Sequence, residues 1–175
     1  MKSKIKIEQL SKLSKGDQGI VCNYRNRFIN MDELKKALKY KNPPKTPDML
    51  YINRKKNEIW FIEFKSNKFD NLKPLKYDIK RKILDGIIVF YELFKDRFCS
   101  FSKNYIVVHK DFEDNEIEVM DNIINLSEYY DLKELEGKFL KYSNVLSCNE
   151  FKNLFINRFG ITFKNTGGKN VSSRV

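Results

Sequence analysis

The stretch Glu58 to Lys65, EIWFIEFK, constrains the fold most, because it is apolar on both faces of any strand that it forms. Side chains alternate across a strand, so Trp60, Ile62 and Phe64 share one face, and the other face is apolar until Glu63 and Lys65. This pattern predicts a central strand that is covered on both sides, with its charged residues at the end where it emerges.

The residues just before this stretch predict its partner in a β-hairpin, with the turn in NRKKN. The sequence allows two positions for this turn. A turn centred on Lys55-Lys56 pairs Asp48 with Glu63, whereas one centred on Lys56-Asn57 pairs Asp48 with Lys65 and leaves Glu63 diagonal to it. In either register the three charged groups share one face, with Cβ atoms roughly 5–8 Å apart.

Two half-buried carboxylates this close repel each other unless a cation neutralises them. Mg²⁺ commonly takes one or two carboxylates and keeps several waters, and the backbone carbonyl of Phe64 is a further candidate ligand. A lysine beside the cation can orient or deprotonate a water and offset charge on a phosphate. We therefore expect a hydrolytic phosphodiesterase site.

Pro47-Asp48, a gap of fourteen residues, and then Glu63-Phe64-Lys65 resemble the motif of the PD-(D/E)xK nuclease superfamily. The resemblance covers about residues 31–112 and implies a restriction-endonuclease-like core of helix, β-hairpin, helix and strand. It also implies that Asp48 and Glu63 bind Mg²⁺, for which Mn²⁺ can substitute, and that Lys65 is the catalytic lysine. Many members add an acidic ligand from the preceding helix, for which Glu33 is the nearest candidate and Glu8 the next.

Another interpretation needs no metal. Asp48 then begins a turn after Pro47, and Glu63 and Lys65 form a solvated ion pair at a strand end. A related alternative keeps the fold and the nucleic-acid surface but has no turnover, as a catalytically silent binding or scaffold module.

The rest of the chain predicts a mixed α/β domain over residues 1–165 and a polar tail over 166–175. Apolar spacing of three or four residues predicts helices near 6–16, 31–42 and 72–95, the second capped by Asn30 or Asp32. The segments NYIVVHKDF and NEIEVMDNIINL read as strands, and DLKELEGKFLKY and NEFKNLFINRF as C-terminal helices.

Charge is distributed unevenly along the chain. Residues 1–110 hold 26 Lys and Arg against 12 Asp and Glu, whereas residues 111–175 hold 8 against 11. Such a basic part favours nucleic acid as the partner, DNA in preference to RNA, although lysine-rich composition alone produces the same bias. On the helix after the hairpin, Lys76 and Lys80, with Lys73 and Arg81, are candidates for contacting phosphates or are simply its solvated face.

The cysteines, the absence of targeting patterns and the single histidine indicate the compartment and limit the chemistry. Three widely spaced cysteines argue against a disulfide framework, and the chain has neither a signal-peptide pattern nor an apolar run long enough for a membrane span, so we expect a cytoplasmic protein. His109, the single histidine, is expected to be structural. A single phosphodiesterase site of the kind expected at Asp48, Glu63 and Lys65 cuts one strand of DNA. Cleavage of both strands would therefore require a homodimer or a larger complex.

Overall fold

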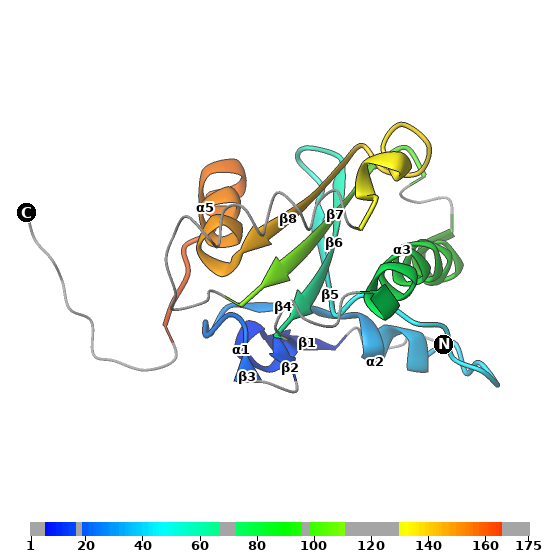
Figure 1. Cartoon of the computed structure of the whole chain (residues 1–175), viewed down its shortest axis with the longest axis horizontal. Coiled ribbons are helices and arrows are strands. Elements are labelled where there is room, and N and C mark those ends of the chain that lie inside the picture. Colours follow the sequence, from blue (N-terminus) through cyan, green and yellow to red (C-terminus); the bar gives the residue numbers. More distant parts are fainter. Residues whose placement is uncertain (1–5, 17–18, 67–72, 96–98, 111–129, 166–175) are drawn as a thin grey trace, which may run out of the picture.

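The computed structural model describes residues 6–16, 19–66, 73–95, 99–110 and 130–165, with the backbone alone for 73–76. A six-stranded mixed sheet in the order β1-β4-β5-β6-β7-β8 runs through the molecule (Figure 1). Its strands are β1 (Ile7–Gln9), β4 (Arg27–Asn30), β5 (Met49–Asn53), β6 (Glu58–Lys65), β7 (Ser102–His109) and β8 (Tyr142–Ser147). A separate ribbon is formed by β2 (Lys15–Gly16) and β3 (Gly19–Ile20).

The predicted hairpin is the centre of this sheet. Strands β5 and β6 are antiparallel, with Met49 opposite Ile62 and Asn53 opposite Glu58, and continuing this register places Asp48 opposite Glu63. The first of the two turn positions is therefore the one adopted. Strands β6, β7 and β8 are mutually parallel, so their carboxyl ends meet at one edge of the sheet.

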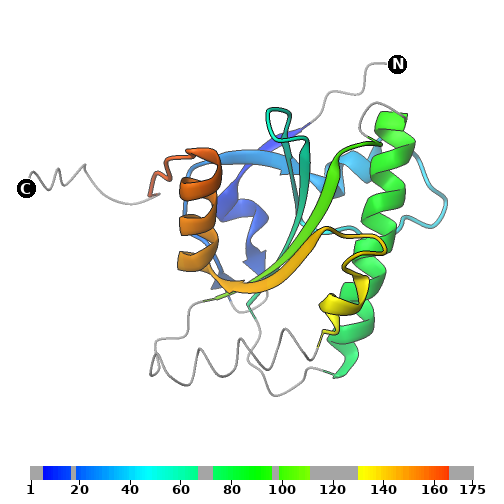
Figure 2. The same ribbon diagram turned by 90° about the horizontal axis from the view of Figure 1, so that it is seen from above.

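Helices cover the two faces of the sheet. Helix α3 (Lys73–Phe94) packs on one face through a core that includes Phe61, Ile83 and Phe90. Helix α5 (Cys148–Phe159) covers the other face through Trp60 and Phe155 (Figure 2). Strand β6 is buried along both faces from Glu58 to Phe64, as its two-sided apolar pattern predicts.

The α/β class, the hairpin, α3, β7 and α5 are confirmed at about the predicted positions. Helix α2 (Met31–Lys36) is shorter than expected, and the Asn30 side chain caps it by accepting the N–H of Glu33.

Two helix predictions are wrong. The N-terminal segment forms β1 before the four-residue helix α1 (Leu10–Leu13), because Ile7 pairs with Ile29 of β4. The segment from residue 131 forms only the short 3₁₀ helix η3 (Leu132–Leu135) before β8 begins at Tyr142, so α5 is the one C-terminal α-helix in the described part. In the first segment pairing with a neighbouring strand overrides weak helical spacing, and in the second Gly137, with a φ of 77°, interrupts it.

The cysteine prediction is also wrong. Cys22 and Cys148 form a disulfide across 126 positions, with Cα atoms 5.7 Å apart. Cys22 is fully buried, and Cys148 lies in the first turn of α5 at the end of β8. Folding brings together two cysteines whose sequence spacing gives no sign of pairing.

Among the described helices, none combines the length and the apolar character needed to cross a membrane. The strand predicted in NEIEVMDNIINL and the polar tail from residue 166 lie outside the described residues.

Candidate metal and catalytic site

Asp48 and Glu63 meet at the end of the β5–β6 hairpin. The Asp48 Oδ2 atom accepts the backbone N–H of Phe64 at 2.7 Å, which draws this carboxylate across to β6. Glu63 is almost fully buried. Two acidic side chains are thus held on the same face of neighbouring strands, as either register of the hairpin requires.

Two lysines contact Glu63. Its Oε1 atom lies 2.8 Å from Nζ of Lys65 and 2.6 Å from Nζ of Lys82, which projects from α3. Its Oε2 atom is buried and accepts no hydrogen bond from any residue that the structure describes. A buried carboxylate oxygen without a partner is costly, and in native proteins it often marks the place of a water or an ion.

Asp48 is in an unfavourable position for a charged group. Burial, with the nearby carboxylate of Glu63, raises the pKa of Asp48 to about 8, although Lys82, the Phe64 N–H and Lys65 oppose that shift. The proton-bound form is therefore preferred near neutral pH when no further cation is present. A cation placed between the two carboxylates would reverse that preference.

The backbone beside this pair offers a further oxygen. Within a strand the N–H and C=O of one residue point to the same edge, so the Phe64 carbonyl faces the side from which Asp48 approaches. The register places Pro47 across from Phe64, and a proline has no N–H to donate.

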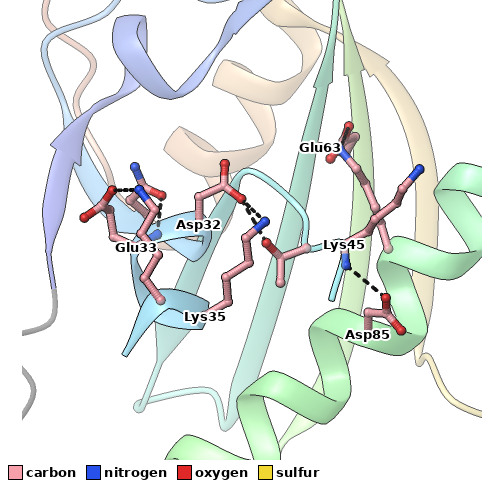
Figure 3. Close-up of polar contacts among 10 residues, drawn as sticks. Asp32, Glu33, Lys35, Lys45, Glu63 and Asp85 are labelled. Carbon is pink, nitrogen blue, oxygen red and sulfur yellow. Dashed lines mark hydrogen bonds and ion pairs between the residues drawn. The ribbon is translucent and has the colours of Figure 1, made fainter. Parts of the chain in front are cut away.

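The loop that carries Asp48 is fastened to α3. The Lys45 N–H bonds to Asp85 at 3.0 Å (Figure 3). The Lys45 ammonium pairs with Asp78. A Cβ atom on Gly86 would lie 2.7 Å from Cδ of Pro47, so this glycine permits the helix to approach the loop closely. Helix α3 therefore sets the position of Asp48 as well as that of Lys82.

The loop is also fastened to α2. The Thr46 hydroxyl bonds to Asp32 at 3.2 Å, and the Asp48 carbonyl accepts the N–H of Met31 at 3.2 Å. The segment before β5 is consequently held from both sides, which fixes a carboxylate that would otherwise move away from Glu63.

Strand β7 pairs with β6 on the side away from β5 and brings further residues close to the acidic pair. Val107 lies opposite Glu63 and His109 lies opposite Lys65. Burial lowers the pKa of His109 to about 4 and Lys65 adds to the effect, so its imidazole is neutral near pH 7, with the Tyr130 hydroxyl 3.4 Å from Nε2. The Tyr105 hydroxyl is buried and makes no hydrogen bond within the described residues.

The β2–β3 ribbon lies against the carboxyl end of β6. A Cβ atom on Gly16 would clash with the side-chain oxygen of Ser66, the residue after Lys65, so only glycine permits this contact. The Lys110 ammonium lies beside Gly19 of β3. Lys110, which follows β7 and donates its N–H to the Lys65 carbonyl, thus lies between the ribbon and the edge at which Lys65 emerges.

Several predicted residues lie elsewhere. Glu33 pairs with Lys36 and Lys6, and it is well separated from Glu63 in Figure 3. Glu8 accepts a hydrogen bond from Asn30. The structure therefore brings neither candidate for the additional acidic ligand to the Asp48–Glu63 pair.

The four basic residues predicted to contact phosphates are not found at the Asp48–Glu63 pair within the described residues. Lys80 pairs with Asp131 and Glu134, and Arg81 pairs with Asp85, so neither contacts the two acids. The side chains of Lys73 and Lys76 lie outside the described part of the structure.

Sequence reasoning did not assign Lys82, Asp78 or Tyr105 to the site. A signal for the first two was available. Ile79, Ile83 and Gly86 form the buried face of α3, and Asp78 and Lys82 are one turn apart at the border of that face. Tyr105 gave no signal, because a tyrosine in a buried strand reads as core.

Within the described residues, no three Asp, Glu, His or Cys side chains gather as a metal-binding cluster. Mg²⁺ sites often use only one or two carboxylates and fill the other positions with water, so the Asp48–Glu63 pair remains of the right composition. Comparison with protein families, curated proteins and solved structures finds no match to this chain.

Proposed function

We propose that this protein is a metal-dependent phosphodiesterase that cleaves DNA with Mg²⁺, for which Mn²⁺ can substitute. The observation that carries the proposal is the pairing of Asp48 with Glu63, whose buried Oε2 atom has no partner among the described residues, beside the ammonium of Lys65. Hard oxygen donors of this kind suit a small divalent cation.

The residues divide the work in the following way. Asp48, Glu63 and the Phe64 carbonyl would hold the cation, which when bound supplies a Lewis acid that polarises a phosphate and lowers the pKa of water. The Lys65 ammonium is well placed to orient the attacking water and to offset negative charge that develops on the phosphate. The loop contacts to α2 and α3 keep Asp48 within reach of Glu63, and positioning of this kind contributes much of a catalytic rate.

The chain order supports the proposal. Three antiparallel strands, β4, β5 and β6, are followed by α3 and then by β7, parallel to β6. This order agrees with a restriction-endonuclease-like core, with Asp48 immediately before the second of the three antiparallel strands and Glu63 on the third, the order that the resemblance to PD-(D/E)xK nucleases implies. Lys45, Lys65 and Lys82 border the pair, and phosphates are the expected partners of such a surface.

Cleavage assays with plasmid, linear and branched DNA and with RNA, each with Mn²⁺ or EDTA, test the proposal. The wild type should cleave DNA only with Mn²⁺, and Asp48→Asn should lose that cleavage. Glu134→Gln is a matched control, because it removes an exposed carboxylate that pairs with Lys80. Absence of cleavage and of Mn²⁺ binding by the wild type would refute the proposal, and a double-strand break would call for a homodimer or a larger complex.

A second function is favoured by one specific observation. Asp48 and Glu63 supply two carboxyl groups, and Lys65 and Lys82 supply two ammonium groups, so the cluster has no excess negative charge that requires a metal. This suits a catalytically silent nucleic-acid-binding module. A protein of that kind would bind DNA in a salt-dependent manner, and its melting temperature would not respond to Mg²⁺ or Mn²⁺.

A further inference from the structure

Lys82 is a second lysine at the acidic pair, and the PD-(D/E)xK motif does not specify it. Its Nζ atom lies 2.6 Å from Oε1 of Glu63, the same oxygen that Lys65 contacts at 2.8 Å. The Lys82 side chain is 18% exposed and that of Lys65 is 12% exposed. Two ammonium groups are therefore confined around one carboxylate oxygen.

This arrangement has no excess negative charge to offset a further cation. With both acids ionised, the four side chains sum to zero charge, and a dication would raise the total to two positive charges in a site largely closed to solvent. At short range and reduced dielectric such an excess is strongly unfavourable. One ammonium must move away from Glu63 when a dication binds.

Lys82 is better placed to move than Lys65. Lys65 extends from the same strand as Glu63, two residues on, and its backbone carbonyl is fixed by the N–H of Lys110 at 3.0 Å. Lys82 comes from α3, where Asp78 lies one turn earlier at the spacing that lets helix side chains meet. Asp78 already draws one ammonium, that of Lys45, to this border of the helix.

We propose that Lys82 is a displaceable counterion, which occupies Glu63 in the cation-free protein and transfers to the Asp78 side of the site when a divalent cation binds. Lys82 consequently weakens cation binding and prevents collapse of the acidic pair in its absence. Once displaced, its ammonium lies at the border of the site, where a substrate phosphate of the cation-loaded protein would meet it. The inference rests on the proposed metal-dependent function.

The first test is calorimetric titration of Mn²⁺ into the wild type, Lys82→Met and Lys80→Met, without DNA. Lys82→Met keeps most of the side-chain length and should bind Mn²⁺ about tenfold more tightly, because the competing charge is gone. Lys80→Met removes the same charge two residues away, from a lysine held by Asp131 and Glu134, and should stay within about twofold of wild type. If Lys82→Met does not fold, Lys82→Gln makes the same comparison.

The outcomes are separable. An unchanged or weaker affinity for Mn²⁺ in Lys82→Met would overturn the counterion role while leaving the metal site intact. A wild type that binds no Mn²⁺ would instead overturn the proposed function, and this inference with it.

A double-mutant cycle tests the alternative partner. Asp78→Asn should weaken Mn²⁺ binding in the wild-type background, since Lys82 then has nowhere to go, and should have little effect in the Lys82→Met background. Equal effects in the two backgrounds would show that Asp78 acts only as a nearby charge, which would overturn the transfer.

DNA binding gives a readout that does not depend on cleavage. With Ca²⁺ in place of Mg²⁺, Lys82→Met should bind DNA several-fold more weakly than wild type, because a phosphate contact is lost. In EDTA the two proteins should bind equally, because Lys82 is then held by Glu63. An equal loss in Ca²⁺ and in EDTA would show that Lys82 faces the phosphate at all times, against the proposal.

Discussion

Replacing Asp48 by Asn measures what it costs the cation-free protein to hold two carboxylates together. Asn keeps an oxygen that can accept the Phe64 N–H but carries no charge. The folded state raises the pKa of Asp48 from its ordinary value of 3.8 to about 8. Between these two values the folded protein holds a proton that the unfolded chain releases, so stability falls as pH rises through this window.

The magnitude follows from the same shift. About three pKa units separate 3.8 from pH 7, and at ~1.4 kcal/mol per unit they amount to about 4 kcal/mol. Asp48 is half-buried, so solvent screens part of this cost, and we expect Asp48→Asn to be more stable than wild type by about 2 kcal/mol at pH 7. At pH 4 the advantage should nearly disappear, because this pH is close to the ordinary pKa of 3.8 and almost none of the window between the two pKa values lies below it.

Urea unfolding of wild type and Asp48→Asn at pH 4, 5.5 and 7, in EDTA, checks this prediction. Asp78→Asn is a control of opposite sign. Burial would raise the pKa of Asp78, but Lys45 together with Lys82 and Lys65 lowers it below its ordinary value, so loss of this charge should destabilise the protein at pH 7. If Asp48→Asn were less stable than wild type by the same amount at all three pH values, the two acids would not repel each other in the folded protein.

Three further predictions follow from the same site. Cation binding should release a proton from Asp48, so Mn²⁺ affinity should rise from pH 6 to pH 8, and calorimetry in buffers of different ionisation enthalpy would detect the proton; a flat profile would contradict the raised pKa. Lys65→Ala should still bind Mn²⁺ but cleave DNA about 10²–10⁴-fold more slowly, and near-normal cleavage in a single-turnover assay would remove Lys65 from the chemistry. Gly86→Ala should push Pro47 away from α3, lowering both the melting temperature and cleavage, whereas wild-type values for both would show that the loop can adjust without cost.

The hairpin was predictable because its signal is local. Alternation along EIWFIEFK fixes which residues share a face, and a four-residue turn then leaves Asp48 opposite Glu63. Long amphipathic spacing likewise predicted α3 and α5. These apolar patterns extend over many residues, so one residue that departs from the pattern does not change the predicted strand or helix.

The errors fall where pairing partners are far apart in the chain. Ile7 is read as helical until Ile29 is known to lie beside it, and Tyr142, the last residue of a predicted helix, instead begins β8 beside β7. Glu33 was predicted from its place in the sequence, but Lys6 and Lys36 hold it elsewhere. Lys82 joins the site through the rotation of α3 on the sheet, which packing sets and helical spacing alone does not.

The Cys22–Cys148 bond turns most of the molecule into a covalent ring, because β4 through β8 all lie between the two cysteines. The exposed turn between β5 and β6 contains Lys55 and Lys56, where trypsin can cut. One cut there opens the ring without dividing the molecule, so the protein should run as a single band on a denaturing gel without thiol. Addition of a thiol to the same sample should release two fragments, which meet at the hairpin that carries Asp48 and Glu63.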